Sequence, residues 1–293
     1  MNFNKVFQSI FLFVKKVARP LFALSFVLFI FFGFWYATVR PTYNHKYISM
    51  YQILPEVSFS GDIVTIHNIR NFSYITEDDF EKNYYTATFD LNKIKSVDYI
   101  LVPFSDNKLK AHTMLSFVFE DGTSFTLSPE GRREKGEQYS LFNATIRRLE
   151  LAYLITSEND ALTLRAVARN NSVYLYPLVL TSESRKTLAL DMLGRSKELF
   201  SSPTWYSLFS DACALNVVRH IQKSVQSDVP LFNFKIFVSS FSDSYLYDNN
   251  LIATSTRFEK MKQDALISEK IRRYADMDDF SRKIREVESE GAN

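Results

Sequence analysis

The sequence is poor in the residues that form cross-links, linkers and metal or cofactor sites. Its single cysteine, Cys213, excludes an internal disulfide. Only 7 glycines and 8 prolines among 293 residues exclude a fibrous or low-complexity chain. A formal net charge of +2 gives no reason to expect nucleic acid as a partner. There is no zinc-ligand spacing, phosphate-binding glycine loop or G-x-S-x-G elbow, so neither a metal nor a cofactor is expected.

The longest uncharged run, residues 21–39, predicts a membrane anchor because its nineteen residues reach about 28 Å as a helix. Residues 1–20 are expected to lie in the cytoplasm and along the membrane surface, or else to extend the anchor helix. A cleaved signal peptide is the rival interpretation, but the run is longer than a usual apolar region and no small-x-small site follows it. Basic residues are denser before the run than after it, which predicts an inner-membrane protein with its N-terminus in the cytoplasm: Lys5, Lys15, Lys16 and Arg19 against Arg40 and Lys46.

Beyond the anchor, the apolar pattern predicts one α+β domain over residues 50–256, with an antiparallel sheet and packed helices. Short alternating segments predict strands at 61–69, 85–91, 97–104, 112–119, 123–128, 161–168 and 172–180.

Helical spacing predicts three further elements and a tail. A helix is expected from Thr181 or Ser182 to about Phe200, and another from Ser210 or Asp211. A helix over 140–153 is expected from the spacing of Leu141, Ile146, Leu149 and Tyr153. Residues 257–293, rich in charged side chains, predict a solvated helical tail.

Cys213 is expected in the first turn of a helix. Ser210 and Asp211 are good N-cap residues just before it, and Cys213, Val217 and Ile221 share one stripe. The partial positive charge at a helix N-terminus stabilises a thiolate and lowers the pKa of the thiol. The stripe also fits an inert, buried cysteine. The position in the first turn favours a reactive thiol.

A thiolate nucleophile needs a base, which is usually histidine. His45 lies next to the anchor, His67 ends a strand, and His220 lies two helical turns beyond Cys213. His112, which opens the strand 112–119, therefore remains as the base by elimination. The alternative is that His112 is a structural residue of the sheet.

The hairpin that contains His112 predicts its partner. A two-residue turn at Asp121-Gly122 would mix polar and apolar side chains on each face, whereas a three-residue turn with left-handed Gly122 separates them. In that register Glu130 lies opposite His112 and can orient the imidazole, although an ordinary polar sheet face has the same pattern. The separated faces are Leu115, Phe117, Phe119, Phe125 and Leu127, against His112, Ser116, Thr126, Ser128 and Glu130.

The polar segment 128–137, SPEGRREKGE, follows this hairpin and carries Arg132, Arg133 and Lys135. Such a run either receives a phosphate head group or is a solvated turn.

Over roughly residues 60–285, the chain resembles the Lnb N-terminal periplasmic domain family. Several long motifs in the family's order carry the resemblance: IHNIRNFSYITEDDF, DLNKIKSVDYI, AHTMLSFVFEDG, SPEGRREKGE, RRLELAYLITSENDALTLRAVAR, VYLYPL and CALNVVRH. Pro129 and Gly131 stand where apolar residues are usual, and Asp211-Ala212 and Ala214-Leu215 flank Cys213 where Asn and Thr are usual.

The resemblance implies a permuted papain-type fold, with a histidine on a strand before a cysteine on a helix. The best-known members are lipoprotein N-acyltransferases, which move an acyl chain from phospholipid to the amino-terminal cysteine of a lipoprotein. They carry further membrane helices after this domain, whereas no second run of anchor length appears here. The resemblance places the nucleophile at Cys213 and the base at His112, and it implies substrate-binding roles at Ser128, Arg132, Glu137 and Asn216, with His220 at another motif position.

The expected function is therefore thiol acyl chemistry at a membrane, with Cys213, His112 and Glu130 as catalytic residues and membrane lipid and lipoprotein as partners. One alternative is a periplasmic cysteine amidase or hydrolase of peptidoglycan or peptides. The other is a catalytically inactive binding module tethered to the membrane.

The charge bias around residues 21–39 predicts that everything after the anchor is periplasmic. Alkaline phosphatase fused after residue 60 should be active, because that enzyme folds only outside the cytoplasm. A stable but inactive fusion would contradict the predicted orientation.

Overall fold

The computed structural model describes residues 3–41, 46–104, 109–136, 147–207, 211–227 and 233–286. The chain divides into two units, Met1–Pro41 and Thr42–Asn293.

The first unit is one helix, α1 (Phe3–Thr38), which continues through Pro20 without a break. Its part Lys15–Thr38 has a mean hydropathy of 2.1 and is long and apolar enough to cross a membrane. The helix thus runs from the expected surface segment directly into the anchor, as the alternative interpretation of residues 1–20 had it.

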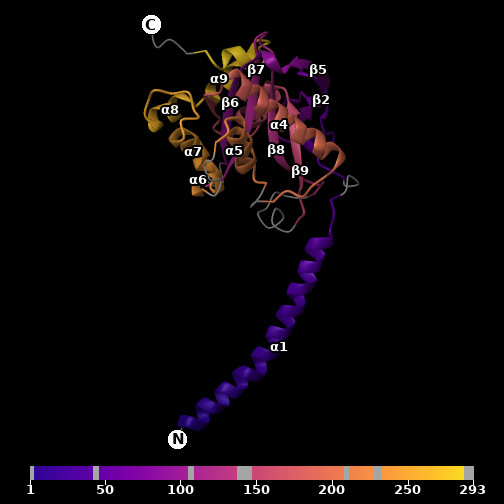
Figure 1. Ribbon diagram of the computed structural model, residues 1–293, viewed down its shortest axis with the longest axis vertical. Helices are drawn as coiled ribbons and strands as arrows, with labels where there is room; N and C mark the ends of the chain where they lie inside the picture. The colour runs from indigo at the N-terminus through magenta and orange to yellow at the C-terminus, as the bar shows by residue number, and fades with distance from the viewer. Residues whose placement is uncertain are drawn as a thin grey trace. The chain divides into compact units, whose positions relative to one another are not determined.

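The second unit is built around an eight-stranded sheet with the strand order β1-β2-β9-β8-β7-β6-β10, and β5 also pairs with β2 (Figure 1). Its neighbours are antiparallel except for β2 and β9, so the expected antiparallel sheet is in fact mixed. A separate ribbon pairs β3 with β4. The strands are β1 (Glu56–Ser60), β2 (Ile63–Arg70), β3 (Ser73–Tyr74), β4 (Phe80–Glu81), β5 (Tyr84–Asp90), β6 (Ile94–Pro103), β7 (Ala111–Phe119), β8 (Ser124–Arg132), β9 (Glu150–Thr156) and β10 (Tyr174–Pro177).

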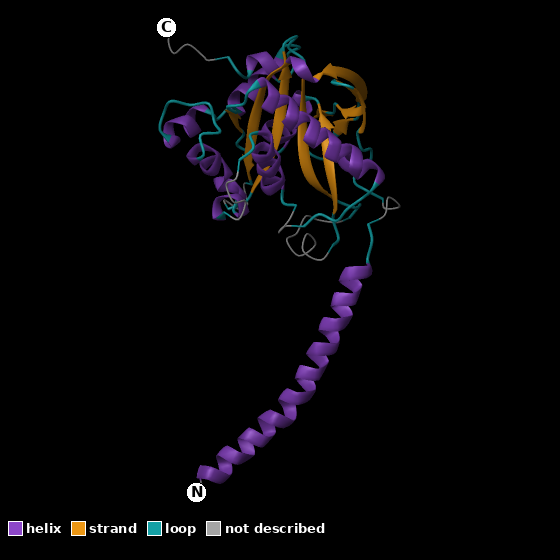
Figure 2. Cartoon of the chain, in the orientation of Figure 1, coloured by secondary structure: helices purple, strands orange, loops and turns teal. Residues whose placement is uncertain are grey.

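Helices cover both faces of this sheet (Figure 2). On one face, α4 packs on β1, β6 and β9, and α5 packs on β7 and β8, within the largest core cluster. On the other face, α3, η3, α9 and α10 enclose a second cluster that includes Met114 and Leu162. The helices of this unit are η1 (Ser49–Tyr51), η2 (Leu91–Lys93), α3 (Glu158–Thr163), η3 (Leu164–Ala168), α4 (Ser182–Ser201), α5 (Cys213–Ser224), α6 (Phe234–Phe237), η4 (Ser239–Phe241), α7 (Ser242–Asp248), α8 (Phe258–Asp264), α9 (Ser268–Tyr274) and α10 (Phe280–Lys283).

The long helix α4 confirms the sequence pattern. The Thr181 hydroxyl accepts a hydrogen bond from the Ser184 backbone N–H at 3.1 Å, as an N-cap should. The stripe of Leu188, Met192 and Leu199 is fully buried against the sheet.

Two element assignments were wrong. Residues 161–168 are not a strand, because Ser157 caps α3 and the chain continues into η3, a π-helical turn. Residues 150–156 are strand β9 and not part of a helix, and the rest of the predicted helix, with Leu141 and Ile146, lies outside the described residues. All seven residues of β9 are buried, so both faces are apolar and the two-residue period that marks a strand is lost.

The charged tail was also misjudged as solvated. Met261, Ile271 and Phe280 are buried in the core, and Arg285 contacts the buried carboxylates of Asp98 and Glu158. Residues 257–286 are therefore part of the domain.

Candidate active site

The β7–β8 hairpin has the register that the separation of polar and apolar faces predicts. The Phe119 N–H donates to the Thr123 carbonyl at 2.9 Å, which leaves a three-residue turn, and Gly122 has a φ of +85°. The paired positions include Leu115 with Leu127 and Phe117 with Phe125. The predicted apolar face is buried in the core as a set.

On the polar face, His112 meets Glu130 as predicted. The His112 Nε2 atom lies 3.1 Å from Glu130 Oε1 and 2.7 Å from the Ser128 hydroxyl. That hydroxyl donates to the same Glu130 oxygen at 2.9 Å. Because Nε2 is occupied in this way, Nδ1 is the nitrogen that remains for the thiol.

Cys213 occupies a position where β7 and β8 part. The ladder between these strands is paired from Leu115 to Val118, although both strands continue beyond it. In this register Pro129 would face Thr113, but proline has no N–H to donate to the Thr113 carbonyl, so the full pair of ladder hydrogen bonds cannot form there. The Cys213 sulfur instead accepts from the Thr113 backbone N–H and lies 3.6 Å from the Ala111 carbonyl. The thiol thus replaces a missing rung of the sheet.

Cys213 is the first residue of α5, which confirms its predicted place at a helix start. The predicted cap was wrong: Ala212 is the N-cap residue and makes no side-chain cap bond, while Ser210 lies outside the described residues. The Asn216 side chain holds this start instead, because its amide donates to the Asp211 carbonyl at 2.8 Å. The N–H groups of the first turn, which have no partner within the helix itself, still give the thiol a positive environment.

The pKa shifts describe a charged pair. Burial alone would lower the pKa of His112, but the Glu130 carboxylate, followed by the hydrogen bond with Cys213, raises it to about 9. Burial raises the pKa of the Cys213 thiol, yet the hydrogen bond with His112 and its positive charge lower it more, so the net pKa is lowered. Both shifts favour a thiolate beside an imidazolium at neutral pH.

Arg165 is the residue of this site that sequence reasoning missed. Its Nη2 atom lies 3.1 Å from Glu130 Oε1, its Nη1 donates to the Ala161 carbonyl at 2.9 Å, and the side chain is buried. Burial raises the pKa of Glu130, but His112, then Arg165, and the Ser128 hydroxyl hold it well below its usual value. Arg165 sits on the π-helical turn η3, and such turns are frequent at functional sites.

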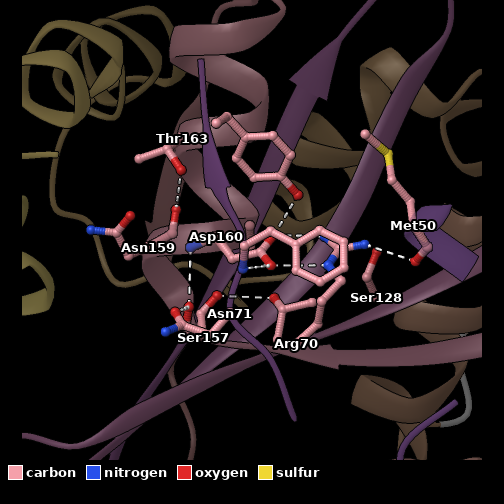
Figure 3. A network of polar contacts seen from close by, with 12 residues as sticks. Met50, Arg70, Asn71, Ser128, Ser157, Asn159, Asp160 and Thr163 are labelled. Carbon is pink, nitrogen blue, oxygen red and sulfur yellow. Dashed lines mark hydrogen bonds and ion pairs between the residues drawn. The ribbon is translucent and has the colours of Figure 1, made fainter. Parts of the chain in front are cut away.

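A buried ion pair fixes the helix that leads to Arg165. The Arg70 guanidinium binds Asp160 through two nitrogens, at 2.9 and 2.7 Å, and donates to the Met50 carbonyl (Figure 3). The Phe72 N–H and the Tyr74 hydroxyl also donate to Asp160. Bidentate pairing of this kind fixes orientation as well as position, so α3 and η3 are held against the sheet.

Of the residues expected to bind substrate, Ser128 lies in the site itself, whereas Arg132 and Asn216 make other contacts. Arg132 is buried: it donates to the Tyr51 carbonyl at 2.8 Å and its guanidinium lies 3.5 Å from the centre of the Tyr47 ring. The Asn216 side chain accepts from Arg219 at 3.1 Å. Ser128 bridges His112 and Glu130, and Glu137 lies outside the described residues.

The other described histidines, His67 and His220, make contacts elsewhere. The His220 ring forms a hydrogen bond of 2.9 Å with the Tyr153 hydroxyl and one of 2.6 Å with the Asp191 carboxylate. Burial lowers the pKa of His220, although the Asp191 carboxylate acts in the opposite direction. His67 is exposed and contacts Thr86, and His45 lies outside the described residues. In the ranges that the structure describes, no group of three His, Cys, Asp or Glu side chains is placed to hold a metal ion.

A cavity of about 360 Å³ opens beside His112. It is lined by Glu77, Val102, Phe104, His112, Arg165, Ala168, Arg169 and Asn171. A larger, open depression of about 1150 Å³ lies elsewhere, between the β7–β8 turn and the C-terminal helices, and the thiol and imidazole are not part of its lining.

The family model described as the Lnb N-terminal periplasmic domain matches residues 80–240, more than half of the 293 residues. The match includes His112, Glu130, Arg165 and Cys213. The chain matches no curated protein and no solved structure.

The charged pair predicts an unusual pH dependence for alkylation of Cys213. Iodoacetamide should label the thiol at mildly acidic pH, below the ordinary thiol pKa of about 8.5. His112→Ala should move the midpoint of labelling to higher pH, because the imidazolium that lowers the pKa is gone. His67→Ala is the matched control and should leave the profile unchanged. If the wild-type chain and His112→Ala both label as an ordinary thiol titrates, the charged pair of Cys213 and His112 is excluded.

Proposed function

Because this chain belongs to the Lnb N-terminal periplasmic domain family, we propose that it is a membrane-anchored thiol acyltransferase in which Cys213 forms an acyl-enzyme. One observation carries the proposal: a thiol with a lowered pKa at a helix start, in contact with an imidazole that Glu130 keeps charged. This is the geometry of an activated cysteine nucleophile.

The family and the apolar helix α1 fit a single-pass membrane protein with a periplasmic domain. In the proposed orientation, α1 crosses the inner membrane with the N-terminus in the cytoplasm. The basic residues before the apolar run support this direction. An enzyme attached in this way meets substrates that are themselves held in the bilayer, which supports a membrane lipid as acyl donor and a lipoprotein as acceptor.

The first half of the proposed reaction forms the acyl-enzyme. The Cys213 thiolate attacks the carbonyl carbon of an ester, and the electron pair of the C=O bond moves to oxygen. The N–H groups in the first turn of α5 stabilise the resulting oxyanion. As the intermediate collapses, His112 gives its proton to the departing alcohol oxygen and a thioester bond to Cys213 remains.

The second half transfers the acyl group. His112, now neutral, takes a proton from an acceptor amine as that amine attacks the thioester carbonyl. Collapse of the intermediate breaks the C–S bond, so an amide leaves and the thiolate beside an imidazolium is restored. Glu130 orients the imidazole throughout, and Ser128 and Arg165 position Glu130. The order of a histidine strand before a cysteine helix supports a permuted papain-type arrangement.

The hydrolase alternative uses the same residues, with water in place of the amine. The fate of the acyl-enzyme separates the two reactions: transfer to an added amine supports the transferase, and release of free acid in its presence supports the hydrolase. An inert binding module is disfavoured because the lowered thiol pKa and the charged His112 are costly to build into a buried site without use.

The proposal predicts a covalent acyl adduct on Cys213. Intact-mass spectrometry of the full chain purified from membranes, or incubated with phospholipid, should show the added mass of one acyl chain, removable by hydroxylamine. Cys213→Ala should abolish it. The rate of adduct formation should fall as the pH rises past about 9, because His112 then loses the proton that it gives to the leaving group.

Glu130→Gln tests the role of the carboxylate within the same assay. The amide keeps the size of the side chain but cannot stabilise an imidazolium, so adduct formation should slow by roughly 10²- to 10⁴-fold. Glu134→Gln, on the same segment beyond β8, is the control and should retain the rate. A full-length chain that never carries an adduct, with phospholipid in excess, would contradict the proposed function.

A further inference from the structure

The cavity beside His112 is lined by residues of two chemical kinds. Val102, Phe104 and Ala168 are apolar, while Glu77, Arg165, Arg169 and Asn171 are charged or polar. A pocket with an apolar lining and a few polar groups is typical of a ligand site. Since His112 is itself part of the lining, a ligand in the cavity would lie next to the proposed reaction centre.

The two arginines differ in how firmly they are held. Arg165 is buried and bound to Glu130 and to a backbone carbonyl. Arg169 is 25% exposed and pairs with Glu77, which is 45% exposed. Both contacts, from the Arg169 Nε at 2.9 Å and Nη2 at 2.7 Å, go to a single Glu77 oxygen. An ion pair this exposed to water is weak and exchanges its partner readily.

Arg165 is repelled by two neighbouring arginines, Arg169 and Arg70. Burial lowers the pKa of Arg165, and repulsion from Arg169 and Arg70 lowers it further, although Glu130 opposes this. One Glu130 oxygen already accepts from His112, Ser128 and Arg165. Arg70 is neutralised by Asp160. Arg169 is thus the cation whose present partner is the easiest to displace.

We propose that this cavity binds an anionic oxygen group, a phosphate ester or a carboxylate, that the acyl substrate carries near its reactive carbonyl. Arg169 leaves Glu77 and binds the anion through the N–H groups of its planar guanidinium. The Asn171 side-chain amide donates a further hydrogen bond to the anion. The apolar lining residues Val102 and Phe104 contact the carbon skeleton next to that group. That the anion belongs to a substrate rests on the proposed function, whereas binding of the anion does not.

Direct binding is measured on the full chain in a non-ionic detergent that contains neither phosphate nor carboxylate, in a Cys213→Ala background that cannot consume the probes. Calorimetry compares three short-chain probes: a dihexanoyl glycerol phosphate ester, an N-hexanoyl acidic amino acid and the uncharged dihexanoylglycerol. The anionic probes should bind and the uncharged one should not. The stronger of the two anionic probes identifies the phosphate or the carboxylate as the natural group.

Two substitutions of opposite expected sign separate a binding site from a structural ion pair. Arg169→Gln should weaken binding of the better anionic probe by about tenfold or more, as the loss of a charge-assisted contact does. Glu77→Gln should strengthen it several-fold, because the competing carboxylate is gone. Arg195→Gln is the matched control, since Arg195 is 26% exposed and pairs with Glu198, and it should have no effect.

Equal binding of the charged and uncharged probes would overturn the proposal. So would equal losses of affinity in Arg169→Gln and Glu77→Gln, which a purely structural pair predicts. The result is independent of catalysis: probes that bind as expected to a chain whose wild-type form never carries an acyl adduct would leave the anion site standing and remove only the acyltransferase.

Discussion

The Glu130 carboxylate is the interaction on which the rest of this site depends. A buried, ionised carboxylate is costly unless donors surround it, and one oxygen of Glu130 accepts from His112, Ser128 and Arg165. Because this oxygen stays negative, His112 stays positive, and because His112 stays positive, the Cys213 thiol loses its proton easily. Removing one partner of such a pair typically costs about 3–5 kcal/mol of stability, so the donors around Glu130 are strongly constrained.

The fold supplies each of these partners from a different element. The tight β7–β8 turn sets the register that places Glu130 across from His112. Pro129 interrupts the same ladder and leaves the Thr113 N–H for the sulfur of Cys213. The Arg70–Asp160 pair, deep beneath the second face of the sheet, orients α3 and therefore the turn that carries Arg165. The site is thus a property of the sheet as a whole.

Much of the fold and of the site could be predicted from the sequence wherever a rule about neighbouring residues determines the structure. Period-two alternation fixed the faces of β7 and β8, and only one turn length keeps those faces separate. The first-turn position of Cys213 was predicted from Ser210 and Asp211 as caps, and the position is right although Ala212 is the N-cap residue. What local rules missed depends on contacts between distant segments. Arg165 lies in ALTLRAVA, which alternates like a strand, and its helical state is fixed by Ser157 and by the ion pair of Asp160 with a residue ninety positions earlier. Arg132 looks solvated in SPEGRREKGE, yet the segment of residues 47–52, far away in sequence, buries it.

The protonation state of His112 is the quantity that tests this account most directly. NMR of the full chain with ¹⁵N-labelled histidine follows the ring nitrogens of His112 and His220 across the pH range. With Glu130 and the thiolate in place, both nitrogens of His112 should carry protons at pH 7.5 and titrate near 9, while His220, whose pKa burial lowers, should be neutral there. A His112 that is neutral at pH 7.5 and titrates near the ordinary value of about 6.5 would contradict the charged pair and the chemistry proposed from it.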